Sequence, residues 1–121
     1  MLVIGEECMD EPWSLVFRME GAEDREKPVT FVCSGYMGRG ERLAQLQEQA
    51  NALAEQGRDM VLDLAHVTGM DSKALGAILT LKDTLKKKGH SCVLRNPSVW
   101  VMKVLEATRL AAFFEVERSG S

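Results

Sequence analysis

The stretch MVLDLAHVTGMDSKALGAILTLKDTLKKKG, residues 60–89, combines a strand pattern with a helix pattern. It opens with a short, nearly continuous apolar run, which predicts a central strand over residues 59–67 covered on both faces. In residues 71–88 the apolar positions recur every three to four residues, which predicts a helix with one buried face. These positions are Ala74, Leu75, Ile78, Leu81 and Leu85, and Gly89 ends the pattern.

Similar patterns extend in both directions from this stretch. Before it we predict strands at 14–19 and 29–35, joined by the charged hairpin loop EGAEDREKP, and a helix at 41–56. After it we predict a strand at 91–95, a turn or cap at 96–98, a helix over 101–108 and a last strand in FFEVE, 113–117. The order predicts an α/β fold: one domain over 1–121 with its core at about 14–117. It should contain a mixed sheet with an N-terminal hairpin, amphipathic helices packed on it, and parallel, right-handed crossovers.

Composition narrows the classes of function. The chain has 121 residues and a net charge of −3, with 15 basic residues scattered among 18 acidic ones, which argues against direct binding of nucleic acid. The basic run Lys86–Lys88 falls at a predicted helix end, where it complements the helix dipole. No apolar stretch is long enough to span a bilayer, and the N-terminus does not fit a signal peptide. We therefore expect a cytoplasmic protein that does not insert into a membrane.

The cysteines and histidines do not form a ligand pattern. Cys8, Cys33 and Cys92 are widely spaced and make no metal motif with His66 or His90. We expect buried free thiols and no metal or cofactor.

Ser72, between the strand and helix patterns, has three interpretations. Asp and Ser favour helix N-termini, so the pair Asp71-Ser72 can be a cap. A nucleophilic serine needs a G-x-S-x-G elbow or an activating base, and G-M-D-S-K-A supplies neither, so we expect no enzyme. In the third interpretation another protein recognises the serine.

The third interpretation rests on a family resemblance. The ordered features are LDL at 62–64, Asp71-Ser72, LGAIL at 75–79, Gly89 and VLEATRL at 104–110. Together they resemble the STAS domain, the fold of bacterial anti-sigma factor antagonists and of sulphate-transporter tails. The likeness is close over residues 60–116 and looser back to residue 29.

The resemblance implies bacterial signalling through partner switching, which regulates transcription. In such antagonists the serine of the Asp-Ser pair is phosphorylated by an anti-sigma factor that is also a kinase, and a phosphatase reverses the modification. Carried over, the phosphorylation site is Ser72. The expected partner-binding residues are Gly69, Met70, Asp71, Lys73 and Leu75, with Tyr36, Met37 and Arg39 from the YMGRG loop at the same edge of the sheet. Packing of Met37 against the first helix is an equal alternative to contact.

The chain departs from the family pattern at several positions. Lys73 and Ala74 stand where a small hydroxyl residue and glycine are usual, and Gly35-Tyr36-Met37-Gly38 lacks the acid of a Gly-x-Leu-Asp pattern. Arg109 replaces a common glycine. Trp100 replaces a polar residue; exposed, it would indicate a second protein contact or a homodimer surface, and a Trp folded onto the sheet is the alternative. These departures keep open a second hypothesis: a STAS interaction or scaffold module, such as a subunit of a membrane transport or signalling complex.

Overall fold

The computed structural model describes residues 15–24, 26–38 and 40–118. These residues form one five-stranded sheet, three α-helices and a short 3-10 helix. In chain order the elements are β1 (Val16–Glu20), β2 (Val29–Met37), α2 (Glu41–Glu55), β3 (Met60–Met70), α3 (Ser72–Lys87), β4 (Cys92–Arg95), α4 (Val99–Ala107), η1 (Ala111–Phe113) and β5 (Glu115–Glu117). The predicted order of strands and helices is confirmed.

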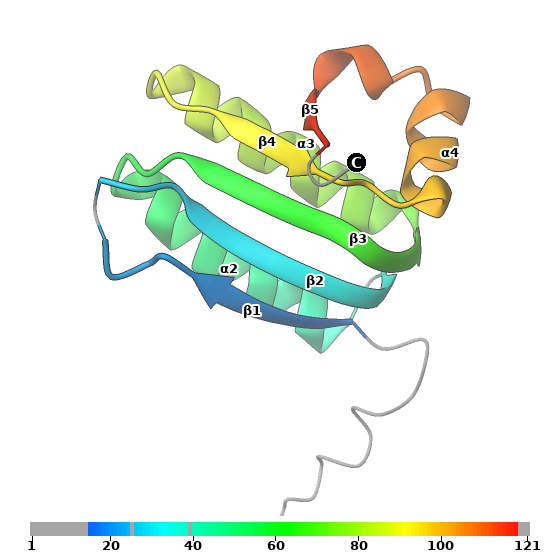
Figure 1. The fold of residues 1–121 in the computed structure, drawn as a ribbon, viewed down its shortest axis with the longest axis horizontal. Coiled ribbons are helices and arrows are strands. Elements are labelled where there is room, and N and C mark those ends of the chain that lie inside the picture. The colour runs from blue at the N-terminus through cyan, green and yellow to red at the C-terminus, as the bar shows by residue number, and fades with distance from the viewer. Residues whose placement is uncertain (1–14, 25, 39, 119–121) are drawn as a thin grey trace, which may run out of the picture.

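The strands lie side by side in chain order, β1-β2-β3-β4-β5 (Figure 1). β1 is antiparallel to β2, and each later neighbour is parallel. The predicted mixed sheet with an N-terminal hairpin is therefore confirmed. Because β2, β3 and β4 are parallel, their carboxyl ends meet at one edge of the sheet, which is where the Asp-Ser pair lies.

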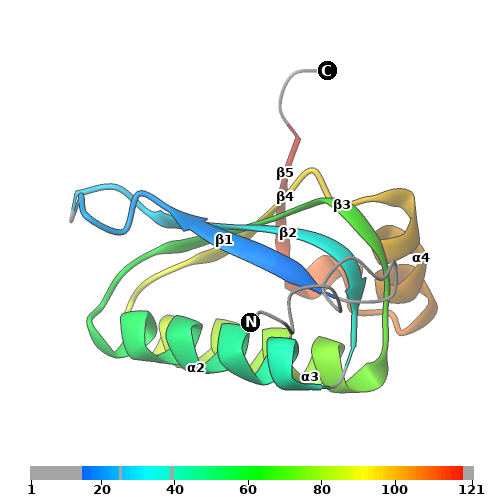
Figure 2. The same cartoon turned by 90° about the horizontal axis from the view of Figure 1, so that it is seen from below.

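The two long helices lie on one face of the sheet. α2 and α3 run along that face, and no described helix lies over the opposite face (Figure 2). The strand predicted over residues 59–67 is nevertheless covered on both faces in its first half, since Met60, Val61, Leu62 and Leu64 are buried. Val61 on the open face is still only 5% exposed, because Thr30 and Val93 flank it in register on the neighbouring strands. Lateral packing within the sheet is enough to produce an apolar run of this kind.

β3 contains more residues than β2 over the same length of the ladder. Val32 faces Asp63 and Tyr36 faces Gly69, so four steps along β2 match six along β3, with register shifts at two places. Extra residues of this kind are β-bulges, which bend a strand and re-aim its side chains. The bulged segment exposes Ala65, His66 and Thr68, and this interrupts the strand pattern. β2 runs to Met37 and β3 runs to Met70, beyond the predicted ends of these strands at 35 and 67.

The helix boundaries are close to the predicted ones. α4 begins two residues before the predicted start, because Ser98 is its N-cap and its side chain accepts from the Val101 amide. Arg109, after α4, has φ 62, a left-handed backbone that favours glycine. No helix among the described residues is long and apolar enough to cross a membrane.

Arg58 ties the β1–β2 hairpin to the end of α2. Its side chain is buried and donates hydrogen bonds to the carbonyls of Gly21, Ala22, Asp24 and Lys27, at 2.8–3.2 Å. These contacts order the charged loop at the end of the sheet opposite the Asp-Ser pair.

We predict that Arg58→Met lowers the free energy of unfolding by about 3 kcal/mol, because it leaves several carbonyls without a charged donor. Urea unfolding followed by circular dichroism measures the change. The control is Arg18→Met, which removes only an exposed ion pair with Glu20 and should cost less than about 1 kcal/mol. Equal losses in the two variants would contradict the role given to Arg58.

Candidate functional site

Asp71 joins the sheet to α3 through three hydrogen bonds. Its amide donates to the Met37 carbonyl at the end of β2, at 3.1 Å. Its carboxylate Oδ1 accepts from the Ala74 amide at 2.9 Å, and its carbonyl accepts from the Leu75 amide at 3.1 Å. Its extended backbone, φ −101 and ψ −179, is that of an N-cap residue. The cap predicted for the Asp-Ser pair is therefore Asp71.

Ser72 is the first residue of α3 and is free of the capping role. Its side chain is exposed, and its hydroxyl makes no hydrogen bond to a described residue. The first N–H groups of a helix have no intrahelical acceptor. At this terminus the amides of Ala74 and Leu75 are taken by Asp71, whereas those of Ser72 and Lys73 have no acceptor among the described residues. The result is an accessible hydroxyl beside two open N–H donors.

Among the residues that the structure describes, neither histidine is hydrogen-bonded to Ser72. His90 contacts Asp59, with Nδ1 and Oδ1 3.0 Å apart, at the opposite end of β3 from Ser72. His66 is exposed on β3 opposite Ser34 and makes no contact with Ser72. Within the described ranges no group of three His, Cys, Asp or Glu residues could hold a metal ion.

The described cysteines are buried free thiols, as predicted. Burial raises the pKa of the Cys33 thiol to about 12, and the Asp63 charge adds to this effect. Burial likewise raises the pKa of the Cys92 thiol to about 12, against the opposing effect of Lys82. Both remain protonated and unreactive at neutral pH. Cys8 lies outside the described residues.

The loops after β2 and β3 meet at one edge, as predicted. Tyr36 lies opposite Gly69 and Met37 opposite Met70 in the parallel ladder, and the bond from Asp71 to Met37 continues this pairing. The order of the strands therefore brings residues 36–38 beside the start of α3. Arg39, also predicted in this group, lies outside the described residues.

The predicted partner-binding residues divide by burial. Met37 is 0% exposed, and Met70 and Leu75 are each 7% exposed, so they support the site from beneath and offer little surface. For Met37 the burial favours packing over contact. Tyr36, Ser72 and Lys73 are exposed, and Asp71 and Gly69 are half-buried. Gly38, which stands where the Gly-x-Leu-Asp pattern has its acid, lies against the Tyr36 ring: a Cβ added there would be 2.6 Å from Tyr36 Cε2.

Comparison with known proteins identifies the family. The model of the STAS domain matches residues 40–120. This chain belongs to the STAS domain family. A curated STAS relative, the anti-sigma-B factor antagonist of Bacillus subtilis (strain 168), is 34% identical over 71 residues, which are 59% of this chain and 65% of the relative. The match thus spans slightly less than two thirds of the relative's length.

Solved structures share the fold of this STAS domain. The unphosphorylated form of the anti-sigma factor antagonist SpoIIAA has a TM-score of 0.73 at 20% identity, covering 88% of this chain and 90% of that one. The phosphorylated form of the Bacillus cell fate determinant SpoIIAA has a TM-score of 0.70 at 20% identity, covering 88% and 93%. An antagonist from Mycobacterium paratuberculosis has a TM-score of 0.73 at 18% identity, covering 88% of each chain.

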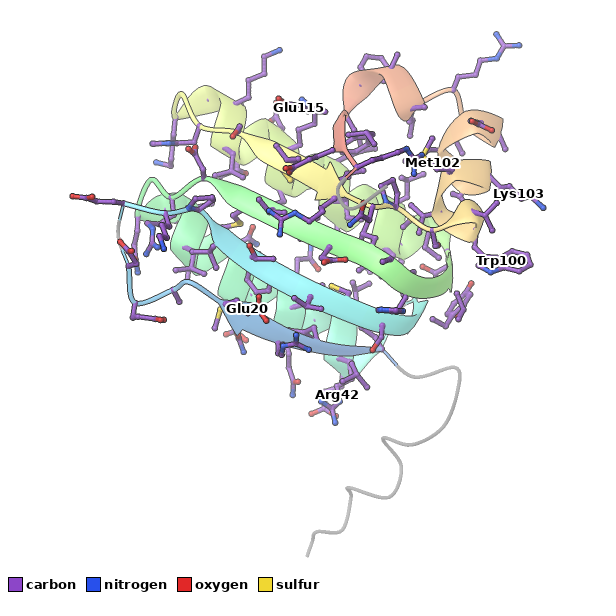
Figure 3. All side chains as sticks on the ribbon, viewed as in Figure 1. Glu20, Arg42, Trp100, Met102, Lys103 and Glu115 are labelled. Atoms are coloured by element: carbon purple, nitrogen blue, oxygen red, sulfur yellow. The ribbon has the colours of Figure 1, made fainter. Side chains whose placement is uncertain are left out.

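A second exposed feature of the STAS domain lies at the start of α4. Trp100 is 52% exposed and points away from the sheet (Figure 3), so the alternative of a Trp folded onto the sheet is wrong. The Lys103 ammonium lies 5.3 Å from its ring centroid, within the range of a cation–π contact. Beside Trp100 is an open hollow of about 430 Å³. It is lined by Ala65, His66, Val67, Thr68, Ser98, Val99 and Trp100.

We predict that Asp71→Ala lowers the free energy of unfolding by about 1 kcal/mol, because α3 loses its capping oxygen. Asp71→Asn should lose less, since its amide oxygen can still accept from the Ala74 amide. Thermal or urea unfolding measures both. Asp83→Ala serves as the control: it removes an exposed pair with Lys87 within α3 and should cost no more than about 0.5 kcal/mol. A loss for Asp71→Ala no larger than this control would contradict the capping role.

Proposed function

We propose that this STAS domain is an anti-sigma factor antagonist that regulates transcription by partner switching. A cognate anti-sigma factor kinase phosphorylates Ser72, and a phosphatase removes the phosphate. The observation that carries the proposal is the exposed hydroxyl of Ser72 at the first residue of α3, which bonds to none of the described residues. The relative named as an anti-sigma-B factor antagonist supports the functional class. In this role the protein is the substrate of a kinase and is not itself an enzyme.

The start of α3 suits a phosphate. A phosphoserine carries about −1.5 to −2 charges at neutral pH, and a helix N-terminus favours an anion through its dipole and its open N–H groups. Ser72 and Lys73 supply two such groups, and the exposed Lys73 adds a cation beside the phosphoacceptor. Phosphorylation should therefore leave the domain folded.

The modification changes the surface that the partner meets. Phosphate at Ser72 adds charge and bound water next to the Asp71 carboxylate, and a partner surface that is acidic or apolar would be repelled. Unfavourable charge contacts at an interface can cost several kcal/mol. The similar TM-scores to the unphosphorylated and phosphorylated SpoIIAA structures support a switch that requires no change of fold. Unphosphorylated protein should bind the kinase and release its sigma factor, and phosphorylated protein should not bind.

A second candidate function is a STAS interaction or scaffold module, for example a subunit of a membrane transport or signalling complex. The exposed Trp100 favours it, because aromatic residues are enriched at protein interfaces. The same side chain could serve a homodimer. In this case Ser72 is an ordinary surface serine, since Asp71 caps the helix.

We predict that an anti-sigma factor kinase of the source organism adds a single phosphate to the protein, and that Ser72→Ala abolishes it. The protein is incubated with ATP, Mg²⁺ and each purified kinase, and its intact mass is measured. Phosphorylated protein should lose its binding to the kinase, as measured by analytical size exclusion.

The matched control is Ser91→Ala, which removes another exposed serine, before β4 at the far end of the sheet, and should leave phosphorylation intact. A phosphate that persists in Ser72→Ala would place the site elsewhere. Absence of phosphate with every kinase, together with stable binding to a transporter or scaffold subunit, would favour the second candidate function.

A further inference from the structure

The Tyr36 ring is held between two glycines at the edge of the sheet. A Cβ added at Gly38 would lie 2.6 Å from Tyr36 Cε2, and one added at Gly69 would lie 3.1 Å from Cε1. Neither glycine has the positive φ that would by itself call for glycine. We attribute Gly38 to the close approach of the ring, which takes the space that a side chain there would need, whereas at Gly69 the ring would have to shift by only a few tenths of an ångström.

The ring lies beside the phosphoacceptor residue. The same Cβ at Gly38 would be 3.1 Å from Asp71 Oδ2, so the ring and the Asp71 carboxylate flank one point of the backbone. Ser72 follows Asp71 directly. Tyr36 is 37% exposed, so part of this residue remains accessible beside the Asp71-Ser72 pair.

We infer that the Tyr36 ring is a specificity-determining contact, and that the kinase places an uncharged, apolar side chain on it. This inference rests on the proposed function and specifies the partner of that site. The Gly-x-Leu-Asp pattern would place an acidic residue at position 38, where this chain has Gly38. The Cβ of that acidic residue would overlap the Tyr36 ring. An acidic residue at position 38 and a ring in this position therefore exclude each other. An acid recognises a cation, whereas an exposed tyrosine ring offers apolar surface that dominates contact energies where it is buried.

Whether phosphorylation weakens or strengthens the complex distinguishes an apolar from a basic partner group. A cation on the ring would be attracted by a phosphate at Ser72, and modification would strengthen the complex. An apolar partner group can pack on the ring only if water leaves the rim of the site. A phosphate beside the ring is strongly hydrated, so it opposes this loss of water. Only the apolar contact is weakened by phosphorylation.

Isothermal titration of the unphosphorylated protein with each purified anti-sigma factor kinase of the source organism, in its ADP-bound form, tests the inference. We expect Tyr36→Ala to weaken binding at least thirtyfold, on the order of a hot-spot residue, and Tyr36→Phe to stay within about threefold of wild type. Gly38→Ala displaces the ring and should weaken binding about tenfold when Tyr36 is present. In the Tyr36→Ala background the same change should have a much smaller effect, because no ring remains to be displaced and only the contact with Asp71 Oδ2 is left.

Two controls separate specificity from stability and charge. Phe113→Ala removes another exposed aromatic ring, in η1, and should leave affinity unchanged. The effect of Tyr36→Ala should be the same at about 0.05 and 0.5 M salt, because an apolar contact is not screened. Circular dichroism confirms that each variant is folded.

The outcomes are distinct. Wild-type affinity in Tyr36→Ala overturns the inference while leaving the proposed function standing. So does an effect that fades at high salt, which would indicate a charged partner group, or a Gly38→Ala loss that is as large without Tyr36 as with it. If wild type binds none of the kinases, the proposed function fails and the inference fails with it.

Discussion

Asp71 is the residue on which the arrangement of the site depends. Its amide extends the β2–β3 ladder by one bond to Met37, while its side chain and carbonyl begin α3. Asp71 is therefore hydrogen-bonded to the sheet through its backbone N–H and to the helix through its carboxylate. Because the two roles are made by different atoms, the direction in which α3 leaves the sheet is determined, and Ser72 follows at the surface with its hydroxyl unused.

The residues around this junction divide into buried ones, which support the site, and exposed ones, which a partner can contact. Met37, Met70 and Leu75 are buried beneath the edge of the sheet, whereas Tyr36, Ser72 and Lys73 are exposed. A surface built on a rigid base can be changed by a modification without rearranging the domain. The binding energy of a partner is then altered locally, by charge and hydration at a few exposed groups.

Local patterns were enough to predict the order of elements and the approach of the two loops. The apolar periodicity of residues 71–88 and the glycine at 89 place α3 within one residue at each end. The bulges in β3 were not predictable, because they depend on pairing with β2 and their exposed residues resemble a strand end. The element that covers each face of β3 was not predictable for a related reason: Val61 is buried by neighbouring strands, and an apolar run does not reveal which element covers it. The family pattern pointed to Ser72. The reason why Gly38 lacks a side chain becomes clear only from the position of the Tyr36 ring in the structure.

The bulges in β3 make the length of this strand a constraint in its own right. Between the pairs Val32–Asp63 and Tyr36–Gly69, β3 holds two residues more than β2. Deleting one of them would turn every following side chain to the other face of the sheet and move Asp71 out of line with Met37. Exposed positions in this segment, such as Ala65 and Thr68, can tolerate substitution. The segment cannot tolerate a change in the number of its residues. Among homologues that keep this site, insertions and deletions should therefore be absent from residues 63–71 even where amino-acid identity has drifted.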